Sequence, residues 1–477
     1  MKIQMKIMES DTETNKNVEL MRGEPEIAIK KLAIPIIISM LLTASYNIID
    51  GIWIVGIGPD AIAGIGFINP IFMILVGVSY GLAAGATSSI SRFVGAHNHE
   101  GANSSATHSI LILFIASILL TIILLLVQKP LLILFGASGG SLSEGLKYGT
   151  PLFLGLIGFM FANGASGILR GEGDMKRAMY AMIVSVGLNT ILDPIFIYIL
   201  NFGSAGAAIA TVISSLISTI VILYWILIKK DTYVDVNLRE FKFNKEITYD
   251  ILKVGIPASM DMILISVALS MYLIFISMLG GDYGVAAFSS GQRLYYFALM
   301  PLSAIGTAIT AVSGSAFGAR NGDYISRSHI YGSKISILFG TCVLIIFYVF
   351  ATPLATMFAY TPETSSLIPG IVSFLQVATL CLPLTGAGMA SSYFYQGIGK
   401  GNISLAWTII REVIMTNILI YLFGIVLGWG LIGVWAGLAT GRALGGGLNF
   451  IFARYTVKNL KKEFASGKLN KKKNKNR

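Results

Sequence analysis

Leu32-Ala33-Ile34-Pro35 opens a long apolar run of this sequence, and Val254-Gly255-Ile256-Pro257 opens another, 222 residues further along. Two more matches follow at nearly the same displacement. Gly95-Ala96-His97-Asn98 pairs with Gly318-Ala319-Arg320-Asn321, and Arg170-Gly171-Glu172-Gly173 pairs with Gln396-Gly397-Ile398-Gly399. Internal repeats of this kind are typical of transport proteins built from two related helix bundles. The repeat therefore predicts a chain of two related halves.

Long apolar runs recur through both halves. Of the 477 residues, 55% are hydrophobic and only 12% are charged, which is too apolar for an average soluble protein. A helix needs roughly 20 apolar residues to cross a hydrocarbon core of about 30 Å. We predict an all-α membrane protein with twelve spanning helices, at residues 32–57, 61–90, 106–127, 146–169, 178–200, 205–228, 252–279, 285–317, 333–358, 366–395, 404–427 and 431–455.

The repeat and the apolar runs together predict the domain organisation. Because an offset of six helices keeps equivalent helices in the same direction, the two lobes form a parallel pseudo-twofold repeat about the membrane normal. Residues 1–31 are polar and mixed in charge, so we expect no cleaved leader and a retained first helix. The remaining predicted segments are an N-lobe at 32–228, a linker at 229–251, a C-lobe at 252–457 and a basic tail at 458–477.

The net charge of +11 is distributed unevenly among the predicted loops. Loops after even-numbered helices carry Arg and Lys repeatedly, whereas loops after odd-numbered helices hold only Lys129 and Lys147. This positive-inside pattern predicts a multi-pass protein of the cytoplasmic membrane with both termini, and the linker, in the cytoplasm. We expect membrane lipids, and not nucleic acid, to be the partner of the basic tail, and we expect a monomer.

Ionisable residues within membrane helices are costly and indicate functional sites. Those that fall inside the predicted spans are Asp50, Asp193, Asp261, Arg293, Arg411, Glu412 and Arg442. Asp50 follows Tyr46 by four residues and Asp193 follows Asn189 by four, so each acid shares a helix face with a polar neighbour.

The repeat supplies an internal control for the two acids of the first half. At the displacements above, Asp50 matches Tyr272 and Asp193 matches Leu419, so the architecture alone does not require an acid at either position. Carboxylate, amide and hydroxyl oxygens suit Na⁺, and two buried carboxylates near each other also favour a bound proton. The alternative is structural: each acid caps a broken helix or pairs with an internal arginine, and we expect the three arginines to be structural.

Several other classes of function are disfavoured. The His97-Asn98-His99 cluster lies in a polar loop without acidic or cysteine partners, which favours a solvated loop over a metal site. The sequence contains no Gly-x-x-x-x-Gly-Lys-Ser/Thr motif, which argues against direct drive by ATP. A membrane-embedded enzyme would need a nucleophile with its base, or a metal cluster, at membrane depth. We therefore expect no enzyme and no cofactor other than a coupling ion.

The motifs resemble those of the multidrug and toxic compound extrusion (MATE) transporters, in particular their DinF-like prokaryotic branch. The resemblance spans nearly the whole chain. Its most specific parts are Tyr46-Asn47-Ile48-Ile49-Asp50, Arg170-Gly171-Glu172-Gly173-Asp174 and the stretch 189–198, which reads Asn-Thr-Ile-Leu-Asp-Pro-Ile-Phe-Ile-Tyr. The resemblance implies two six-helix lobes around a central cavity and export of cationic amphiphilic compounds in exchange for Na⁺ or H⁺.

The same resemblance assigns roles to single residues. The residues that match the family's cation-coupling site, as a Na⁺ or H⁺ site, are Asp50, Asn189, Asp193 and Thr211. Those that match its substrate cavity are Tyr46, Asn163 and, in the seventh helix, Asp261. Pro35 matches a proline at which the first helix is proposed to bend.

The tenth predicted helix departs from part of the family. Members with a cation site in the second lobe carry an acid there, whereas residues 384–389 read Leu-Thr-Gly-Ala-Gly-Met. We therefore expect no coupling site in the second lobe. The nearest alternative function is a lipid-linked precursor flippase of the same superfamily, which the acids of the first lobe and the count of twelve helices disfavour.

Overall fold

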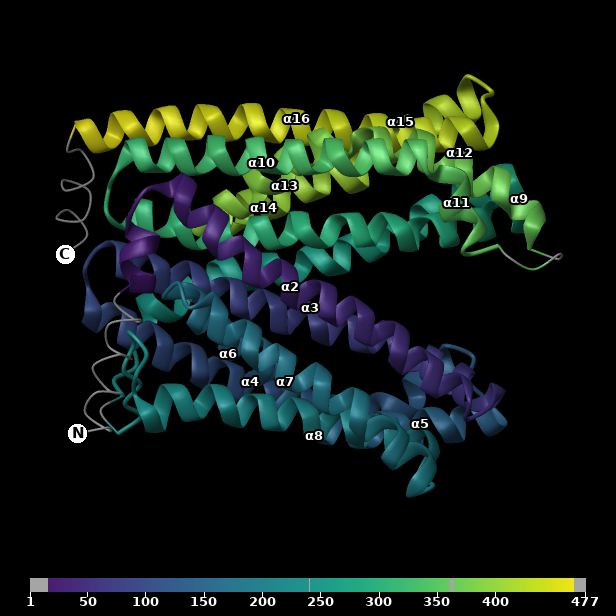
Figure 1. Ribbon diagram of the computed structural model, residues 1–477, viewed down its shortest axis with the longest axis horizontal. Helices are drawn as coiled ribbons and strands as arrows, with labels where there is room; N and C mark the ends of the chain where they lie inside the picture. Colours follow the sequence, from purple (N-terminus) through teal and green to yellow (C-terminus); the bar gives the residue numbers. More distant parts are fainter. Residues whose placement is uncertain (1–15, 240, 360, 362–363, 467–477) are drawn as a thin grey trace. The chain divides into compact units, whose positions relative to one another are not determined.

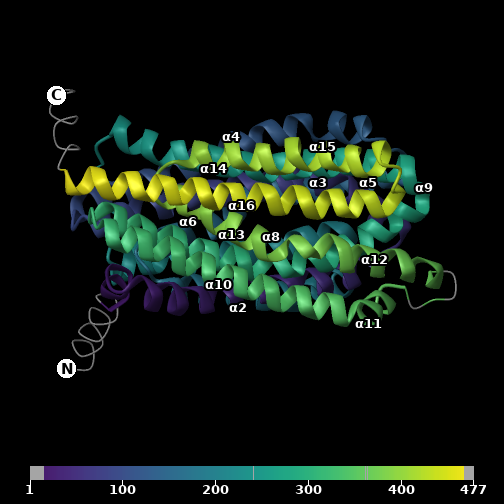
Figure 2. The ribbon, with the colours of Figure 1, turned by 90° about the horizontal axis from the view of Figure 1, so that it is seen from above.

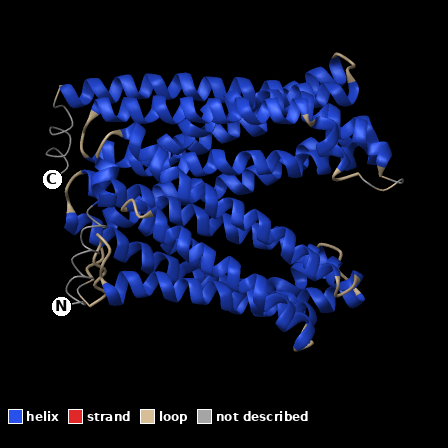
Figure 3. Cartoon of the chain, in the orientation of Figure 1, coloured by secondary structure: helices blue, strands red, loops and turns tan. Residues whose placement is uncertain are grey.

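The computed structural model describes residues 16–239, 241–359, 361 and 364–466. Regular structure in this part of the chain is helical throughout (Figure 3). The ends of the predicted N-terminal segment and of the basic tail, residues 1–15 and 467–477, lie outside the described residues. An all-helical fold is what the repeated apolar runs predict, because a backbone in lipid must satisfy its own hydrogen bonds.

The chain forms two compact units. Among the described residues, the first comprises 16–23 and 34–259, and the second comprises 24–33 and 260–466. The chain passes between the units at three points: just before α2 (Pro25–Val55), inside α2, and inside α9 (Lys245–Gly318). Each predicted half of the sequence thus supplies most of one unit.

The first unit is a bundle in which α3 and α8 each pack against several other helices. α3 contacts α4, α5 and α6, and α8 contacts α5, α6 and α7 (Figure 1). Their bounds are α3 Pro59–Gly95, α4 His99–Leu134, α5 Gly139–Leu154, α6 Leu156–Gly171, α7 Met175–Pro194 and α8 Gly203–Leu223. Small residues allow these close approaches, since a Cβ atom on Gly64 would lie 2.5 Å from the backbone nitrogen of Gly145.

The second unit has α13 packed against α10 and α16 (Figure 2). The helices of this unit that follow α9 are α10 Gly322–Val349, α11 Ala351–Thr356, α12 Ile368–Ala378, α13 Leu382–Gly397, α14 Gly401–Thr408, α15 Thr416–Tyr421 and α16 Gly430–Ala465. Its core includes the rings of Phe288, Phe374 and Trp435, with Phe288 and Trp435 stacked at 5.9 Å between centroids. A Cβ atom on Gly388 would lie 2.5 Å from the Cα atom of Gly446, which explains the small residues where α13 meets α16.

Each predicted span has a helix or a broken helix in the structure. Nine helices of the described chain are long and apolar enough to cross a membrane, and ten if α5 and α6, which meet at 53°, form one broken span. α9 accounts for two predicted spans because it breaks at Gly281, whose φ of 54° is a conformation that favours glycine. α16 covers the last. The prediction of twelve helices in two lobes is confirmed.

Two of the four π-helical segments in the described chain lie at charged residues of the predicted spans. η1 (Ile195–Ile199) continues α7 directly after Asp193-Pro194, and η5 (Ile409–Met415) contains Arg411 and Glu412. Pro194 lacks an amide hydrogen, so the helical hydrogen-bond ladder is interrupted next to Asp193. π-helical turns inside membrane helices are frequent at functional sites. η1 follows Asp193 directly and η5 contains Arg411 and Glu412, so both segments mark positions where a charged side chain lies within a predicted span.

The segment that follows α8 is docked on the first unit. Glu172, at the end of α6, accepts a hydrogen bond from the Val234 amide at 3.1 Å, and Arg177 pairs with Asp231 at 2.9 Å. The Glu172 side chain is buried, and this burial, with the charge of Asp174 beside it, raises the pKa of Glu172 to about 8. The linker is thus fastened to the bundle through a carboxyl group that favours its protonated form.

Candidate cation-coupling site

Three of the predicted site residues are joined by hydrogen bonds in the first unit. Asn189 and Asp193 lie one turn apart on α7, with 3% and 0% of their surface exposed. The Asn189 amide nitrogen lies 3.3 Å from Asp193 Oδ1 and 3.3 Å from Thr211 Oγ1 on α8. The spacing of four residues brings the first pair together, and the packing of α7 on α8 brings Thr211 to them.

Asp50 and Tyr46 reach the same place from α2. The side chain of Asp50 contacts that of Asp193, and the Tyr46 hydroxyl contacts Thr211. Two ionised carboxylates at this range repel each other. Either a proton shared between them or a cation bound to both would relieve the repulsion.

Two buried oxygen atoms of this cluster have no hydrogen-bond partner among the described residues. They are Oδ1 of Asn189 and Oδ2 of Asp193. A buried polar atom without a partner costs on the order of 1–3 kcal/mol, so an unpaired oxygen beside a carboxylate pair is unfavourable unless a ligand completes it. Hard oxygen donors of this kind fit Na⁺, which the residues Asp50, Asn189, Asp193 and Thr211 would hold.

Tyr148 is a member of this cluster that the sequence analysis missed. It lies on α5, close enough to Asp50 and Asp193 for their charges to act on its phenol group. No spacing relates Tyr148 to either acid, since the three residues come from three different helices. Its position at the polar start of the span predicted at 146–169 is the single sequence feature that could have drawn attention to it.

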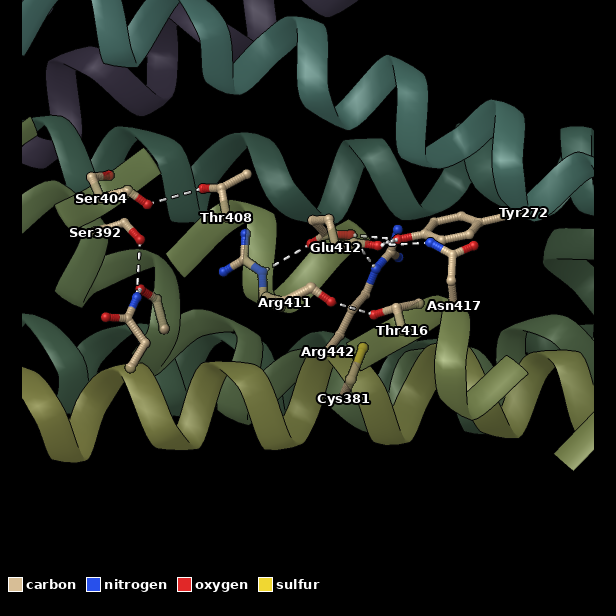
Figure 4. Close-up of polar contacts among 12 residues, drawn as sticks. Tyr272, Cys381, Ser392, Ser404, Thr408, Arg411, Glu412, Thr416, Asn417 and Arg442 are labelled. Carbon is tan, nitrogen blue, oxygen red and sulfur yellow. Dashed lines mark hydrogen bonds and ion pairs between the residues drawn. The ribbon is translucent and has the colours of Figure 1, made fainter. Parts of the chain in front are cut away.

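The second unit holds a polar cluster of different composition (Figure 4). Glu412 pairs with Arg411 through Oε1 at 2.9 Å and with Arg442 through Oε2 at 3.1 Å. Tyr272 donates to the same residue, and the Arg442 guanidinium lies 4.9 Å from the ring centre of Tyr295. The π-helical turn η5 lets the consecutive residues Arg411 and Glu412 both face the interior.

Asp261 lies at the edge of this second cluster. Its side chain contacts Thr408 and lies within range of the Arg411 charge, while its Oδ1 atom is buried without a hydrogen-bond partner in the described chain. Counted as ionised groups, Asp261 and Glu412 balance Arg411 and Arg442. Arg411 and Arg442 thus take part in a paired network, and the structural role expected for them stays a prediction.

A comparison of the sequence with protein-family models identifies the family of this chain. The MatE family model matches residues 35–195 and 257–429, which together exceed half of the chain. The chain belongs to the MATE family. The matched segments of this MATE protein include Asp50, Asn189 and Asp193 of the first-unit cluster and Arg411 and Glu412 of the second, whereas Thr211 and Arg442 lie outside them.

Curated relatives of this MATE protein include a probable multidrug resistance protein and a multidrug export protein, from two bacteria. It is 27% identical over 340 residues to the probable multidrug resistance protein YoeA of Bacillus subtilis (strain 168), covering 69% of this chain and 73% of the relative. It is 26% identical over 399 residues to the multidrug export protein MepA of Staphylococcus aureus (strain MRSA252), covering 82% of this chain and 86% of the relative.

Solved transporter structures share the fold over 94% of this chain. One is a transporter of the MOP superfamily from Pyrococcus furiosus, whose binding pocket is described as of reverse polarity. It matches with a TM-score of 0.90 at 38% identity, over 94% of this chain and 99% of that one. A crystal structure of MATE in the bent conformation matches equally well, with a TM-score of 0.90, 38% identity and the same coverage.

Two predicted residues of this MATE protein lie apart from the hydrogen-bonded cluster. Asn163 donates to the carbonyl oxygen of Phe159 one turn earlier on α6, at 3.0 Å, and no described contact joins it to the acids. Pro35 lies inside α2, which runs as one helix from Pro25 to Val55, and its carbonyl oxygen accepts from Ser39 at 2.9 Å. The cavity role of Asn163 and a bend at Pro35 remain predictions.

Proposed function

We propose that this MATE protein exports cationic amphiphilic drugs or metabolites in exchange for Na⁺ or H⁺, by alternating access. Its matched relatives are named multidrug resistance and multidrug export proteins, which supports a role as a drug efflux transporter and not as an enzyme. The protein would act as a monomer in the cytoplasmic membrane with both termini in the cytoplasm, as the distribution of Lys and Arg favours.

One observation carries the coupling part of the proposal. The carboxyl groups of Asp50 and Asp193 contact each other, and buried oxygens of Asn189 and Asp193 have no hydrogen-bond partner in the part of the chain that the structure describes. A site of this composition binds one positive charge, either Na⁺ or a proton. A cationic substrate in the first-lobe cavity would interact with the same acids, so binding of the ion and binding of the substrate would oppose each other.

Opposed binding of the ion and the substrate produces transport when the two ligands favour different conformational states of the transporter. A ligand shifts a conformational equilibrium only by the difference in its affinity for the two states. α2 carries Asp50 and Tyr46, and it also contains Pro35, where the ladder of helical hydrogen bonds lacks one member. Bending of α2 at Pro35 would move Asp50 relative to Asp193 and change the affinity of the pair for the ion.

The purified chain in proteoliposomes tests this proposal. Vesicles loaded with ethidium, a cationic amphiphile, would be given a Na⁺ gradient, a pH gradient, both or neither. We expect gradient-driven movement of ethidium, together with opposite movement of the coupling ion. Ethidium movement that is the same with every gradient would contradict exchange, and movement of a pyrophosphate-linked lipid in place of ethidium would favour the flippase alternative.

A further inference from the structure

An open pocket of about 380 Å³ lies between α10 and α16 in the second unit, away from the Glu412 cluster. Its volume is within the range of small-molecule binding sites. The lining side chains are polar, basic or aromatic with one exception, a valine. They are Ser326, Arg454, Tyr455, Val457, Lys458 and Lys461.

The three basic side chains of this pocket come from one face of α16. Arg454, Lys458 and Lys461 are spaced by four and three residues, which places them above one another on a helix. Arg454 is held in position by α10, since its Nη2 atom lies 3.1 Å from Ser326 Oγ and its Nη1 atom lies 3.4 Å from the Ser326 carbonyl oxygen. Lys461 forms an ion pair with Asp323, which offsets one of the three positive charges. The pocket thus keeps a surplus of positive charge.

The position of the pocket along α16 indicates whether its ligand comes from the membrane or from solution. On the side of α16 that carries Tyr455 and Lys458, the preceding residues Leu448 and Ile451 are 46% and 63% exposed, as expected of a surface that faces lipid. Tyr455, which lines the pocket, is 62% exposed, and Lys458 begins the basic end of the helix. Aromatic and basic side chains in this order mark the level at which a helix leaves the hydrocarbon region and meets lipid headgroups.

We propose that this pocket binds the phosphate headgroup of an anionic phospholipid. The phosphate would lie between Arg454 and Lys458, and the acyl chains would run along the exposed apolar surface of Leu448 and Ile451. Arginine presents several N–H donors in a plane that suits phosphate oxygens, and lysine adds a point charge. A soluble phosphate compound would be attracted by the same charges but would gain nothing from the neighbouring apolar surface.

The full-length protein in neutral detergent tests this site. Phosphatidylglycerol or phosphatidylcholine would be titrated in, and bound lipid would be counted by native mass spectrometry. We expect phosphatidylglycerol to bind more tightly, and the double variant Arg454→Gln/Lys458→Gln to bind it about thirtyfold more weakly, from about 1 kcal/mol per basic residue. The matched control is Lys462→Gln, which removes a basic residue next to Lys461 that does not line the pocket.

A variant that fails to fold can be distinguished from a folded variant that fails to bind lipid. If the double variant elutes as aggregate, the single variant Lys458→Gln, which changes an exposed side chain, is measured in its place. Equal affinity for the two lipids, or equal loss in the Lys462→Gln control, would contradict a specific headgroup site. Binding of inorganic phosphate or glycerophosphoglycerol with the affinity of the whole lipid would contradict a lipid source. The measurement requires no transport, so it stands independently of the proposed exchange.

Discussion

The Tyr272 hydroxyl lies 2.6 Å from the backbone carbonyl oxygen of Glu412 and 3.1 Å from its Oε2 atom. In the internal repeat, Tyr272 occupies the position of Asp50. Asp50 meets another acid in the first unit, whereas Tyr272 meets an acid that already pairs with two arginines. The two units have thus diverged in charge, and we expect ion coupling to depend on the first unit and the Glu412 network to act in stability.

Substitution of either acid in the first unit should stop exchange. We expect Asp50→Asn and Asp193→Asn each to reduce ion-driven ethidium export to the level of empty vesicles, because an amide cannot neutralise a cation or carry the transported proton. Transport in proteoliposomes at matched protein content measures the effect. Asp282→Asn, which changes an exposed acid of α9, is the control and should export normally. Wild-type export by either site variant would remove that residue from the coupling mechanism.

Na⁺ binding should depend on pH. Because Na⁺ and protons would use the same carboxyl oxygens of Asp50 and Asp193, we expect Na⁺ affinity to weaken as the pH falls, and we expect no Na⁺ binding by Asp193→Asn. Calorimetric titration of the purified protein with NaCl between pH 5 and 8, with choline chloride as the salt control, measures this. A Na⁺ affinity unaffected by both pH and Asp193 would place the ion elsewhere.

Glu412→Gln should destabilise the second unit. The substitution leaves two buried guanidinium groups without their shared counter-ion, and breaking a buried pair in this way costs about 3–5 kcal/mol. Thermal unfolding in detergent should therefore begin at a lower temperature than in the wild type. The double variant Glu412→Gln/Arg442→Met restores the balance of charge, so its unfolding temperature should fall less than that of Glu412→Gln. A stable Glu412→Gln protein that no longer transports would instead make Glu412 a functional residue.

Docking of the linker on the first unit should weaken as the pH rises. The pKa of Glu172 is about 8 in the fold against a usual value of 4.5, so between these values the docked carboxyl keeps a proton that the released one would lose. The free energy needed to release the linker should fall by about 1.4 kcal/mol per pH unit between the two pKa values. It should no longer change above about pH 8. Hydrogen exchange of the Val234 amide, corrected for its intrinsic rate, measures release. Glu172→Gln should show no such pH dependence, and a parallel response of both proteins would exclude Glu172 as its cause.

Labelling of single cysteines tests the orientation. In a Cys342→Ser/Cys381→Ser background, we expect Ser141→Cys, in α5 after an odd-numbered span, to react with an impermeant maleimide on intact cells. Lys242→Cys in the linker should react only after permeabilisation, because the proposed topology keeps the basic loops in the cytoplasm. The reverse pattern would invert the topology.

The helices and their pairing into two halves could be predicted because a segment that crosses lipid has to form an apolar helix of a set length. A span must be helical and roughly 20 residues long, so apolar runs and the glycines between them mark each helix, including the break of α9 at Gly281. The polar pairs Tyr46 with Asp50 and Asn189 with Asp193 could be found in the same way, because residues four apart share a helix face.

Contacts between helices needed the tertiary structure. The approach of Tyr148 to the two acids, the pairing of Glu412 with Arg442 and the Ser326 contact of Arg454 each join residues from different helices. Helical periodicity says which residues share a face but not which neighbour that face meets, since many helices present similar apolar surfaces. The sequence alone therefore identified the charged residues inside the membrane, and the packing of the helices decided that two acids meet in one unit while an acid meets two arginines in the other.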